Sequence, residues 1–158
     1  MLSDNQTIAI SFILWPTFQF IASRIANKLP ISFYNDNNVL FKTKKWEKGG
    51  SFYQTYFRIK SWKEYMPDSS FFNKNKYAKK RITDFSDENL YRFLIESRKA
   101  ELVHILSVLP FWVWIIISRV EVMLLMLLYA LIANIPCIII QRYNRPRIKE
   151  YLNRRKEL

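Results

Sequence analysis

The sequence has one cysteine and one histidine among its 158 residues. A single cysteine, Cys137, excludes a disulfide framework within the chain and a cluster of thiolates around a metal ion. A single histidine, His104, excludes a metal site built from several histidines. We therefore expect no metal and no resident cofactor in this protein.

Charge is missing from three long stretches, residues 5–23, 102–118 and 122–140. At about 1.5 Å of rise per helical residue, each stretch is about long enough to cross a hydrocarbon core of about 30 Å. Buried helices of soluble proteins rarely stay apolar on every side over such a length. We therefore expect an all-α membrane protein with three transmembrane helices, an N-terminal anchor (5–23) and a C-terminal hairpin (102–118 and 122–140).

A cleaved signal peptide is the alternative interpretation of the first stretch. Such a peptide needs basic residues before its apolar run and a small-residue cleavage site after it. Here the leader carries Asp4 and no base, whereas Arg24 and Lys28 follow the run. This order favours a helix that is retained in the mature protein.

Basic residues are concentrated in the two polar segments next to these spans. Residues 42–99 hold 15 basic and 7 acidic residues, a net charge of +8, and the tail 141–158 holds 7 and 2, a net charge of +5. Basic segments beside membrane spans stay in the cytoplasm. We therefore expect a multi-pass membrane protein with its N-terminus outside and both basic segments in the cytoplasm. The hairpin then turns outside the cell through residues 119–121.

The segment between Trp46 and Met66 interleaves aromatic residues with lysines. This mixture predicts one or two amphipathic helices at the level of the lipid headgroups, with breaks at Gly49–Gly50 and at Pro67–Asp68. Basic and aromatic residues together can also bind nucleic acid, but beside three membrane spans we expect lipid contacts and no nucleic acid. Residues 73–81, with five bases, are expected to form a solvated loop that faces anionic lipid.

A helix start follows this loop. Ser86 can cap the helix, and Asp87 and Glu88 suit its first turn because they lie at the positive end of the helix dipole. No helix breaker follows before Pro110. We therefore expect a helix over residues 87–99 that continues directly into the second span.

One face of this helix carries polar and apolar side chains at spacings of three or four residues, namely Leu90, Leu94, Ser97, Glu101, His104 and Val108. Because the face begins apolar, Glu101 and His104 are expected to point into the protein. Ionisable groups at a membrane edge are costly and are functional candidates by default. A histidine held by a carboxylate is a better base. The alternative is a structural ladder of Arg98, Glu101 and His104 that only stabilises the helix end.

The end of the third span carries a second polar set. Asn134 and Gln141 are seven residues apart and share a helix face, and in an antiparallel hairpin Asn134 lies at a depth comparable to that of His104. The two polar sets are therefore expected to meet in one pocket at the cytoplasmic membrane edge. Arg142 and Arg145 beyond them can bind phosphates, or they can be the basic residues that follow a membrane span.

Three blocks of residues form a distinctive pattern. The first is Glu96-Ser97-Arg98-Lys99-Ala100-Glu101-Leu102-Val103-His104, with Pro110 beyond it, and the second is Asn134-x-Pro136 followed by Gln141-Arg142-Tyr143-Asn144-Arg145-Pro146-Arg147. The third holds Lys48, Gly50, Phe52, Phe57, Trp62 and Lys63. From about Phe41 to Arg147, the order and spacing of these blocks resemble the glycosyl-4,4'-diaponeurosporenoate acyltransferase family.

The resemblance implies the last step of staphyloxanthin-type carotenoid synthesis, in which a fatty acyl group is esterified onto a sugar hydroxyl of a glycosyl carotenoid carboxylate. The donor is then an acyl thioester such as acyl-coenzyme A. The resemblance carries no catalytic residues, so chemistry alone assigns His104 as the general base and Glu101 as its orienting partner. The expected substrate contacts are Glu96, Arg98, Asn134, Gln141, Arg142, Asn144 and Arg145. The H-x-x-x-x-D arrangement of soluble-faced glycerolipid acyltransferases is absent, because Leu109 occupies the acidic place.

Two other functions compete with a membrane acyltransferase. In a non-catalytic membrane subunit or scaffold, the cluster of Arg98, Glu101 and His104 would only hold the hairpin together. A transporter is disfavoured because ionisable groups at one membrane edge give no continuous polar path. The sequence leaves open the acceptor, the acyl chain length, the carrier of the acyl group and the oligomeric state.

Overall fold

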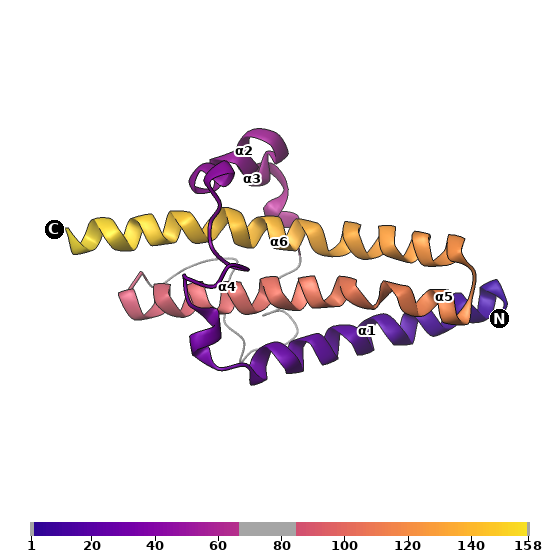
Figure 1. The fold of residues 1–158 in the computed structure, drawn as a ribbon. Helices are drawn as coiled ribbons and strands as arrows, with labels where there is room; N and C mark the ends of the chain where they lie inside the picture. Colours follow the sequence, from indigo (N-terminus) through magenta and orange to yellow (C-terminus); the bar gives the residue numbers. More distant parts are fainter. Residues whose placement is uncertain (1, 67–84, 158) are drawn as a thin grey trace. The chain divides into compact units, whose positions relative to one another are not determined.

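A computed structural model describes residues 2–66 and 85–157, and all regular secondary structure in this described part of the chain is helical (Figure 1). The features that the sequence predicts at Pro67–Asp68 and at residues 73–81 lie outside it. The elements are, in chain order, α1 (Asp4–Lys28), η1 (Ile31–Tyr34), η2 (Lys45–Gly50), α2 (Ser51–Phe57), α3 (Ile59–Trp62), η3 (Lys63–Tyr65), α4 (Asp87–Val108), η5 (Leu109–Trp112), α5 (Val113–Ile117) and α6 (Val120–Lys156), where η marks a 3₁₀ helix.

Three helical stretches are long and apolar enough to cross a membrane: Asn5–Lys28, Asp87–Ile117 and Val120–Lys156. Apart from Ser118, they contain the three charge-free runs of the sequence, so the expected all-helical class with three candidate spans is confirmed. Their outward side chains are largely apolar, and large hydrophobic residues such as Phe12, Ile116 and Ile132 are more than 60% exposed. In water such exposure would be unfavourable, whereas lipid chains can cover it.

The chain divides into two compact units. Unit 1 consists of Met1–Leu29 and Ala100–Ile138, and unit 2 consists of Pro30–Lys99 and Ile139–Leu158. Both α4 and α6 therefore contribute residues to each unit. We describe each unit by itself.

Aromatic and small residues pack unit 1. The indole of Trp114 is fully buried, its Nε1 donates a hydrogen bond to the Ser11 hydroxyl over 2.8 Å, and its ring stacks on Trp15 with 4.7 Å between centroids. Three alanines are buried as well, namely Ala22, Ala26 and Ala130. Small residues let helix backbones approach closely, which is the usual basis of helix association in lipid.

Helix α4 begins where the sequence predicts. The backbone N–H of Asn89 bonds to the Ser86 hydroxyl over 3.4 Å, which places Ser86 at the cap. Leu90, Leu94 and Glu101, members of the predicted inward face, are at most 4% exposed. The helix ends at Val108 because proline at 110 cannot continue the α-helical ladder, and the chain passes through η5 into α5.

The turn of the hairpin is shorter than expected. The sequence predicts a turn over residues 119–121, whereas α5 ends at Ile117 and α6 begins at Val120, so that only Ser118 and Arg119 lie between them. Glu121 falls in the first turn of α6, where a carboxylate is stabilised by the helix dipole. Helix α6 then continues to Lys156, so the basic tail is helical.

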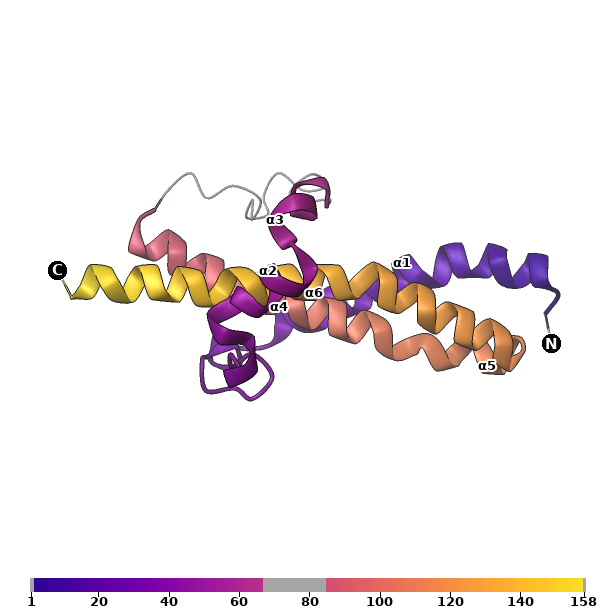
Figure 2. The ribbon, with the colours of Figure 1, turned by 90° about the horizontal axis from the view of Figure 1, so that it is seen from above.

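In unit 2, η2, α2 and α3 pack beside the second half of α6 (Figures 1 and 2). Tyr53, Ile59 and Tyr143 form the buried centre of this contact. The predicted break at Gly49–Gly50 is confirmed, since both glycines have a positive φ. A Cβ on Gly50 would lie 2.8 Å from the carbonyl oxygen of Tyr143, so only glycine allows the turn to approach α6 this closely.

Candidate functional site

The first part of the candidate site lies in unit 1 and joins α4 to α6. The Nδ1 atom of His104 lies 2.9 Å from the side-chain oxygen of Asn134. The side-chain nitrogen of Asn134 donates a hydrogen bond to the carbonyl oxygen of Ala130 over 2.8 Å. Asn134 is 6% exposed, and His104 is half-buried. The sequence placed these two residues at comparable depths, and the structure brings them together.

These two contacts determine which nitrogen of His104 is protonated. A backbone carbonyl only accepts hydrogen bonds, so the Asn134 amide must turn its NH₂ group to Ala130 and its oxygen to His104. An amide oxygen also only accepts, so Nδ1 of His104 must carry the hydrogen. In the neutral imidazole, Nε2 is then unprotonated and can accept a proton.

Glu101 lies one helical turn before His104 on α4, and its side chain is fully buried. A carboxylate at that position adds negative potential close to the imidazole. The sequence reasoning gave Glu101 the task of orienting His104. Nδ1 of His104 donates its hydrogen bond to the side-chain oxygen of Asn134, a residue predicted to contact substrate.

The second part of the candidate site lies in unit 2 and centres on Glu47. Its carboxylate accepts hydrogen bonds from the Tyr53 hydroxyl over 2.5 Å, from Arg142 over 3.0 Å and from the backbone N–H of Lys44 over 2.5 Å. Arg142 also donates to the carbonyl oxygen of Leu40 over 2.7 Å. Burial and the hydrogen bond to Glu47 raise the pKa of Tyr53, which keeps the phenol neutral and a donor.

Arg98 makes a similar set of contacts from α4. Its guanidinium donates to the backbone carbonyl of Tyr34 over 2.6 Å and pairs with the Asp36 carboxylate. The other oxygen of Asp36 lies 3.0 Å from Lys149 of α6. Arg98 is 6% exposed, so its charge depends on these partners. Arg98 and Arg142 thus hold residues 34–47 against α4 and α6 within unit 2.

The remaining predicted site residues also lie in unit 2. Glu96 pairs with Lys99 over 2.9 Å. Arg145 is 3% exposed, and its guanidinium lies 5.9 Å from the centre of the Phe41 ring. Gln141 and Asn144 are half-buried on α6, and the side-chain oxygen of Gln141 has no hydrogen-bond partner among the described residues. Within those residues, no three His, Cys, Asp or Glu side chains are grouped to hold a metal ion.

Glu47 and Asp36 were missed by the sequence reasoning, although the chain contains a signal for each. Asp36 is the only charged residue between Lys28 and Lys42, and Glu47 and Glu64 are the only acids between Lys42 and Met66. A lone acid in an uncharged or basic segment often pairs with a distant base. The partners, Arg98 and Arg142, are 62 and 95 residues away and could not be read from spacing.

Comparisons with known proteins match the region of the chain that holds the two parts of the candidate site. No solved structure matches the chain. Residues 37–154, more than half of the chain, match the sequence profile of the family described as glycosyl-4,4'-diaponeurosporenoate acyltransferase.

The chain is also similar to curated proteins of that name. It is 36% identical to one from Staphylococcus haemolyticus over 137 residues, covering 87% of this chain and 80% of that protein. It is 32% identical to one from Staphylococcus aureus strain MRSA252 over 138 residues, covering 87% and 83%. The profile match and these identities over most of both chains show that the protein belongs to the glycosyl-4,4'-diaponeurosporenoate acyltransferase family.

Proposed function

We propose that this protein transfers a fatty acyl group from an acyl thioester to a sugar hydroxyl of a glycosyl carotenoid carboxylate in the membrane. Family membership supports the reaction class and the acceptor. The observation that supports a catalytic centre is the contact between His104 and Asn134, which leaves a basic imidazole nitrogen on a helix that can span a membrane.

In the proposed reaction, Nε2 of His104 is the general base. It takes the proton of the sugar hydroxyl as the hydroxyl oxygen attacks the thioester carbonyl carbon. The tetrahedral intermediate then collapses, the carbon–sulfur bond breaks, and the imidazolium returns its proton to the leaving sulfur. An ester and a free thiol result. The Asn134 oxygen keeps the imidazole in the required tautomer throughout.

Other polar side chains of the candidate site are suited to stabilise the imidazolium and to contact the sugar. Glu101 stabilises the imidazolium that forms when His104 accepts the proton. The buried oxygen of Gln141, which lacks a partner among the described residues, is suited to accept a hydrogen bond from a sugar hydroxyl. Asn144 and Glu96, both half-buried, are further candidates for contacts with the sugar.

The arginines take a positioning role in this proposal. Arg98 and Arg142 already donate to carboxylates and backbone carbonyls, and Arg145 is buried against Phe41. Their contacts fasten the segment that carries Asp36 and Glu47. A guanidinium that is buried and paired in this way is less available to a ligand than an exposed one.

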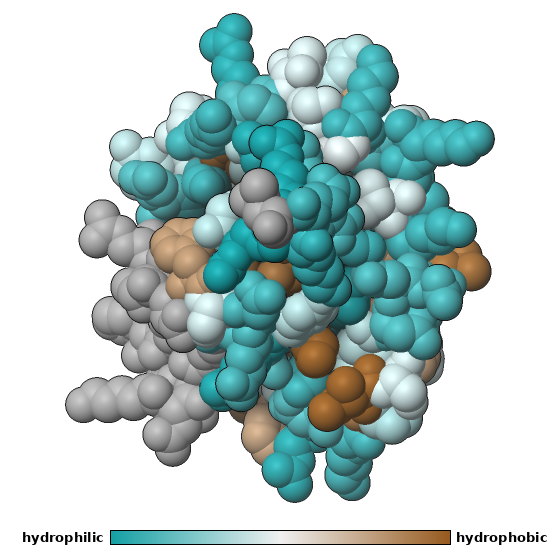
Figure 3. All heavy atoms as spheres, turned by 90° about the vertical axis from the view of Figure 1, so that its left-hand side faces the viewer, coloured by the Kyte–Doolittle hydropathy of each residue, from teal (hydrophilic) through white to brown (hydrophobic). Residues whose placement is uncertain are grey.

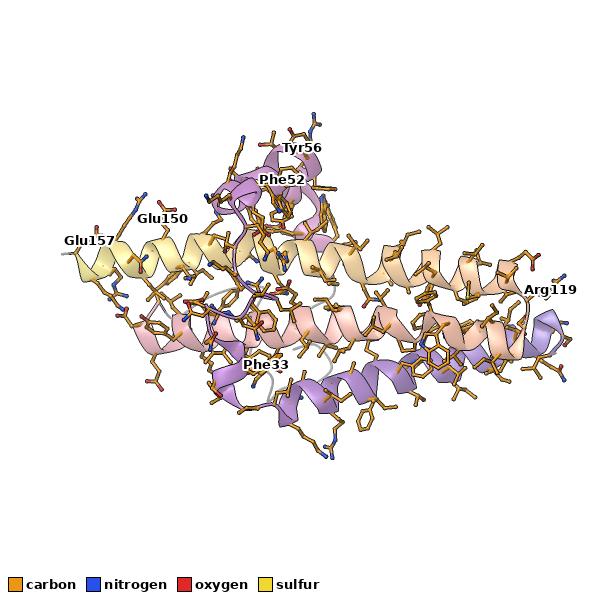
Figure 4. The ribbon with its side chains drawn as sticks, viewed as in Figure 1. Phe33, Phe52, Tyr56, Arg119, Glu150 and Glu157 are labelled. Atoms are coloured by element: carbon orange, nitrogen blue, oxygen red, sulfur yellow. The ribbon has the colours of Figure 1, made fainter. Side chains whose placement is uncertain are left out.

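The proposed setting is the bacterial cell membrane, with the N-terminus outside and the basic segments in the cytoplasm. The net charges of residues 42–99 and 141–158 support this orientation. Exposed aromatic side chains in the central segment support its contact with lipid headgroups. Trp46, Tyr56 and Tyr65 are 52%, 71% and 86% exposed, and Figure 4 shows Tyr56 beside Phe52 on α2.

The proposal is tested by pigment and lipid mass spectrometry of cells that make the glycosyl carotenoid, with and without this protein. We expect a product heavier than the acceptor by one fatty acyl group only when the protein is present. His104→Gln should abolish this product while the protein level in the membrane stays unchanged. Product formation by the His104→Gln variant would contradict the catalytic role. Loss of the variant from the membrane would instead favour a structural role of the cluster.

A further inference from the structure

Unit 2 contains a groove that none of the roles above uses. The groove has a volume of about 450 Å³, which is within the range of about 300–1,000 Å³ typical of small-ligand sites. Lys48 and Ser51 line one wall, and Arg147, Glu150, Tyr151 and Arg154 of α6 line the other. Figure 4 shows Glu150 on the side of α6 where α2 lies, and Figure 3 shows that hydrophilic side chains dominate the surface at this end of unit 2.

The charge of the groove suits an anion. Three of its lining residues are bases and one, Glu150, is an acid. Glu150 already binds Arg154 over 2.5 Å. Among the described residues, neither Lys48 nor Arg147 has a carboxylate partner. Two cations are therefore available to a ligand, with a third beside them.

Arg147 is held in place for such a ligand. Its guanidinium lies 4.7 Å from the centre of the Tyr143 ring, and Tyr143 is 2% exposed. Stacking uses the face of the guanidinium and leaves its N–H edge available. That planar edge can donate two parallel hydrogen bonds to a phosphate. The contact with Tyr143 already restricts the Arg147 side chain. Arg147 therefore loses less conformational entropy when a ligand binds.

The backbone turn that carries Lys48 is also fixed. Lys48, Gly49 and Gly50 have φ values of 46°, 62° and 90°, all in the left-handed region. The close approach of Gly50 to the Tyr143 carbonyl anchors this turn against α6. The same tyrosine therefore positions Arg147 through its ring and Lys48 through its backbone.

We propose that this groove binds the phosphate groups of the acyl donor, a nucleotide-linked thioester of the coenzyme A type. This assignment rests on the proposed acyl transfer, in which the donor is an acyl thioester. The phosphates then meet Lys48, Arg147 and Arg154. Two arginines that the sequence analysis expected to contact substrate, Arg98 and Arg142, are instead paired with Asp36 and Glu47. An anionic phospholipid headgroup has the same phosphate chemistry, so the test separates these two sources.

The test measures equilibrium binding of free coenzyme A to the full-length protein in phosphatidylcholine nanodiscs. Arg147→Glu and Lys48→Glu should each weaken binding by about tenfold or more, because a charge-assisted hydrogen bond is replaced by repulsion. Lys60→Glu is the matched control, since Lys60 is an exposed base of unit 2 outside the groove, and its affinity should stay within about twofold. Pantetheine, which lacks phosphates, should not bind detectably.

Binding of coenzyme A needs no chemistry, so it is measured equally well in the His104→Gln variant. If the wild-type protein binds coenzyme A as expected but forms no acylated product, the groove assignment stands and the proposed reaction fails. If acyl transfer occurs but Arg147→Glu and Lys48→Glu leave the affinity unchanged, the groove assignment is overturned. If nanodiscs containing phosphatidylglycerol abolish coenzyme A binding in the wild type, the ligand is a lipid headgroup and the donor assignment is overturned.

Discussion

Asn134 makes one contact with each end of its amide, and this decides how His104 can react. The contact with Ala130 orients the amide, and the contact with Nδ1 then selects the tautomer of the imidazole. A positioned general base contributes about 10²–10⁴-fold to a reaction rate, and this contribution requires the correct tautomer of the imidazole. The proposed mechanism therefore gives Asn134 a kinetic signature of its own.

Replacing Asn134 with Leu should lower kcat by about 10–100-fold without unfolding the protein, because the imidazole loses the acceptor that holds its tautomer. Asn134→Asp is the informative control. A carboxylate also accepts from Nδ1, so this variant should keep more activity. An aspartate carboxylate at this position still selects the tautomer in which Nδ1 carries the hydrogen.

These outcomes distinguish catalysis from packing. A structural role for Asn134 predicts that both variants lose stability together and that their activities fall by the same factor. The measurement is kcat for acyl transfer by purified protein in nanodiscs, with thermal unfolding of the same samples. An unchanged kcat in Asn134→Leu would exclude the proposed orienting role.

Glu47 and Arg142 form the second residue pair with a testable consequence. The Glu47 side chain is 2% exposed and that of Arg142 is 17% exposed, so removing one charge leaves the other poorly solvated. We expect Glu47→Gln to destabilise the protein by about 3 kcal/mol, measured by thermal or denaturant unfolding in a mild detergent. Adding Arg142→Met should recover part of this loss. Strictly additive effects of the two changes would show that the pair does not interact.

At the scale of secondary-structure elements, the turn between η2 and α2 determines how the central segment approaches α6. Gly49 and Gly50 both have a positive φ, which costs a residue with a side chain about 1–2 kcal/mol. Only Gly50 lies against a backbone atom, the carbonyl oxygen of Tyr143. Gly49 and Gly50 thus differ in whether a Cβ atom would meet a backbone atom of α6.

Gly50→Ala should therefore be more destabilising than Gly49→Ala. Both changes carry the cost of the left-handed backbone, and Gly50→Ala adds about 1–3 kcal/mol for a clash that a backbone carbonyl cannot relieve by rotating. The midpoints of thermal unfolding of the two purified variants give the comparison. Since the turn carries Lys48, Gly50→Ala should also weaken binding in the groove. Equal unfolding midpoints would contradict the close approach.

The sequence predicted the elements whose position depends on residues close together in the chain. Three charge-free runs give three candidate spans because a bilayer selects length and apolarity, and Ser86 and Pro110 bound α4 through their own backbone chemistry. The spacing in the hairpin also predicted that Asn134 meets His104. The pairing of Arg142 with Glu47 was not predictable, since its partners are far apart in the chain and only folding of the central segment joins them.

At the scale of the whole molecule, the distribution of charge predicts how the chain crosses the membrane. Cysteine labelling tests this orientation in a background with Cys137→Ala. Asn5→Cys and Asn153→Cys place single thiols at exposed positions near the start of α1 and near the end of α6. A membrane-impermeant maleimide should label Asn5→Cys in intact cells and Asn153→Cys only after the membrane is opened, because bases hold the tail in the cytoplasm.

The same pair of variants tests the first span and the reaction together. A cleaved leader would remove the thiol of Asn5→Cys, so labelled protein at full length requires a retained helix. Labelling of Asn153→Cys in intact cells would instead put the Lys48–Arg147 groove outside, where no coenzyme A-type donor is supplied. The donor assignment therefore requires a cytoplasmic tail. An external tail would overturn the donor assignment, whatever the affinity for coenzyme A measured in nanodiscs.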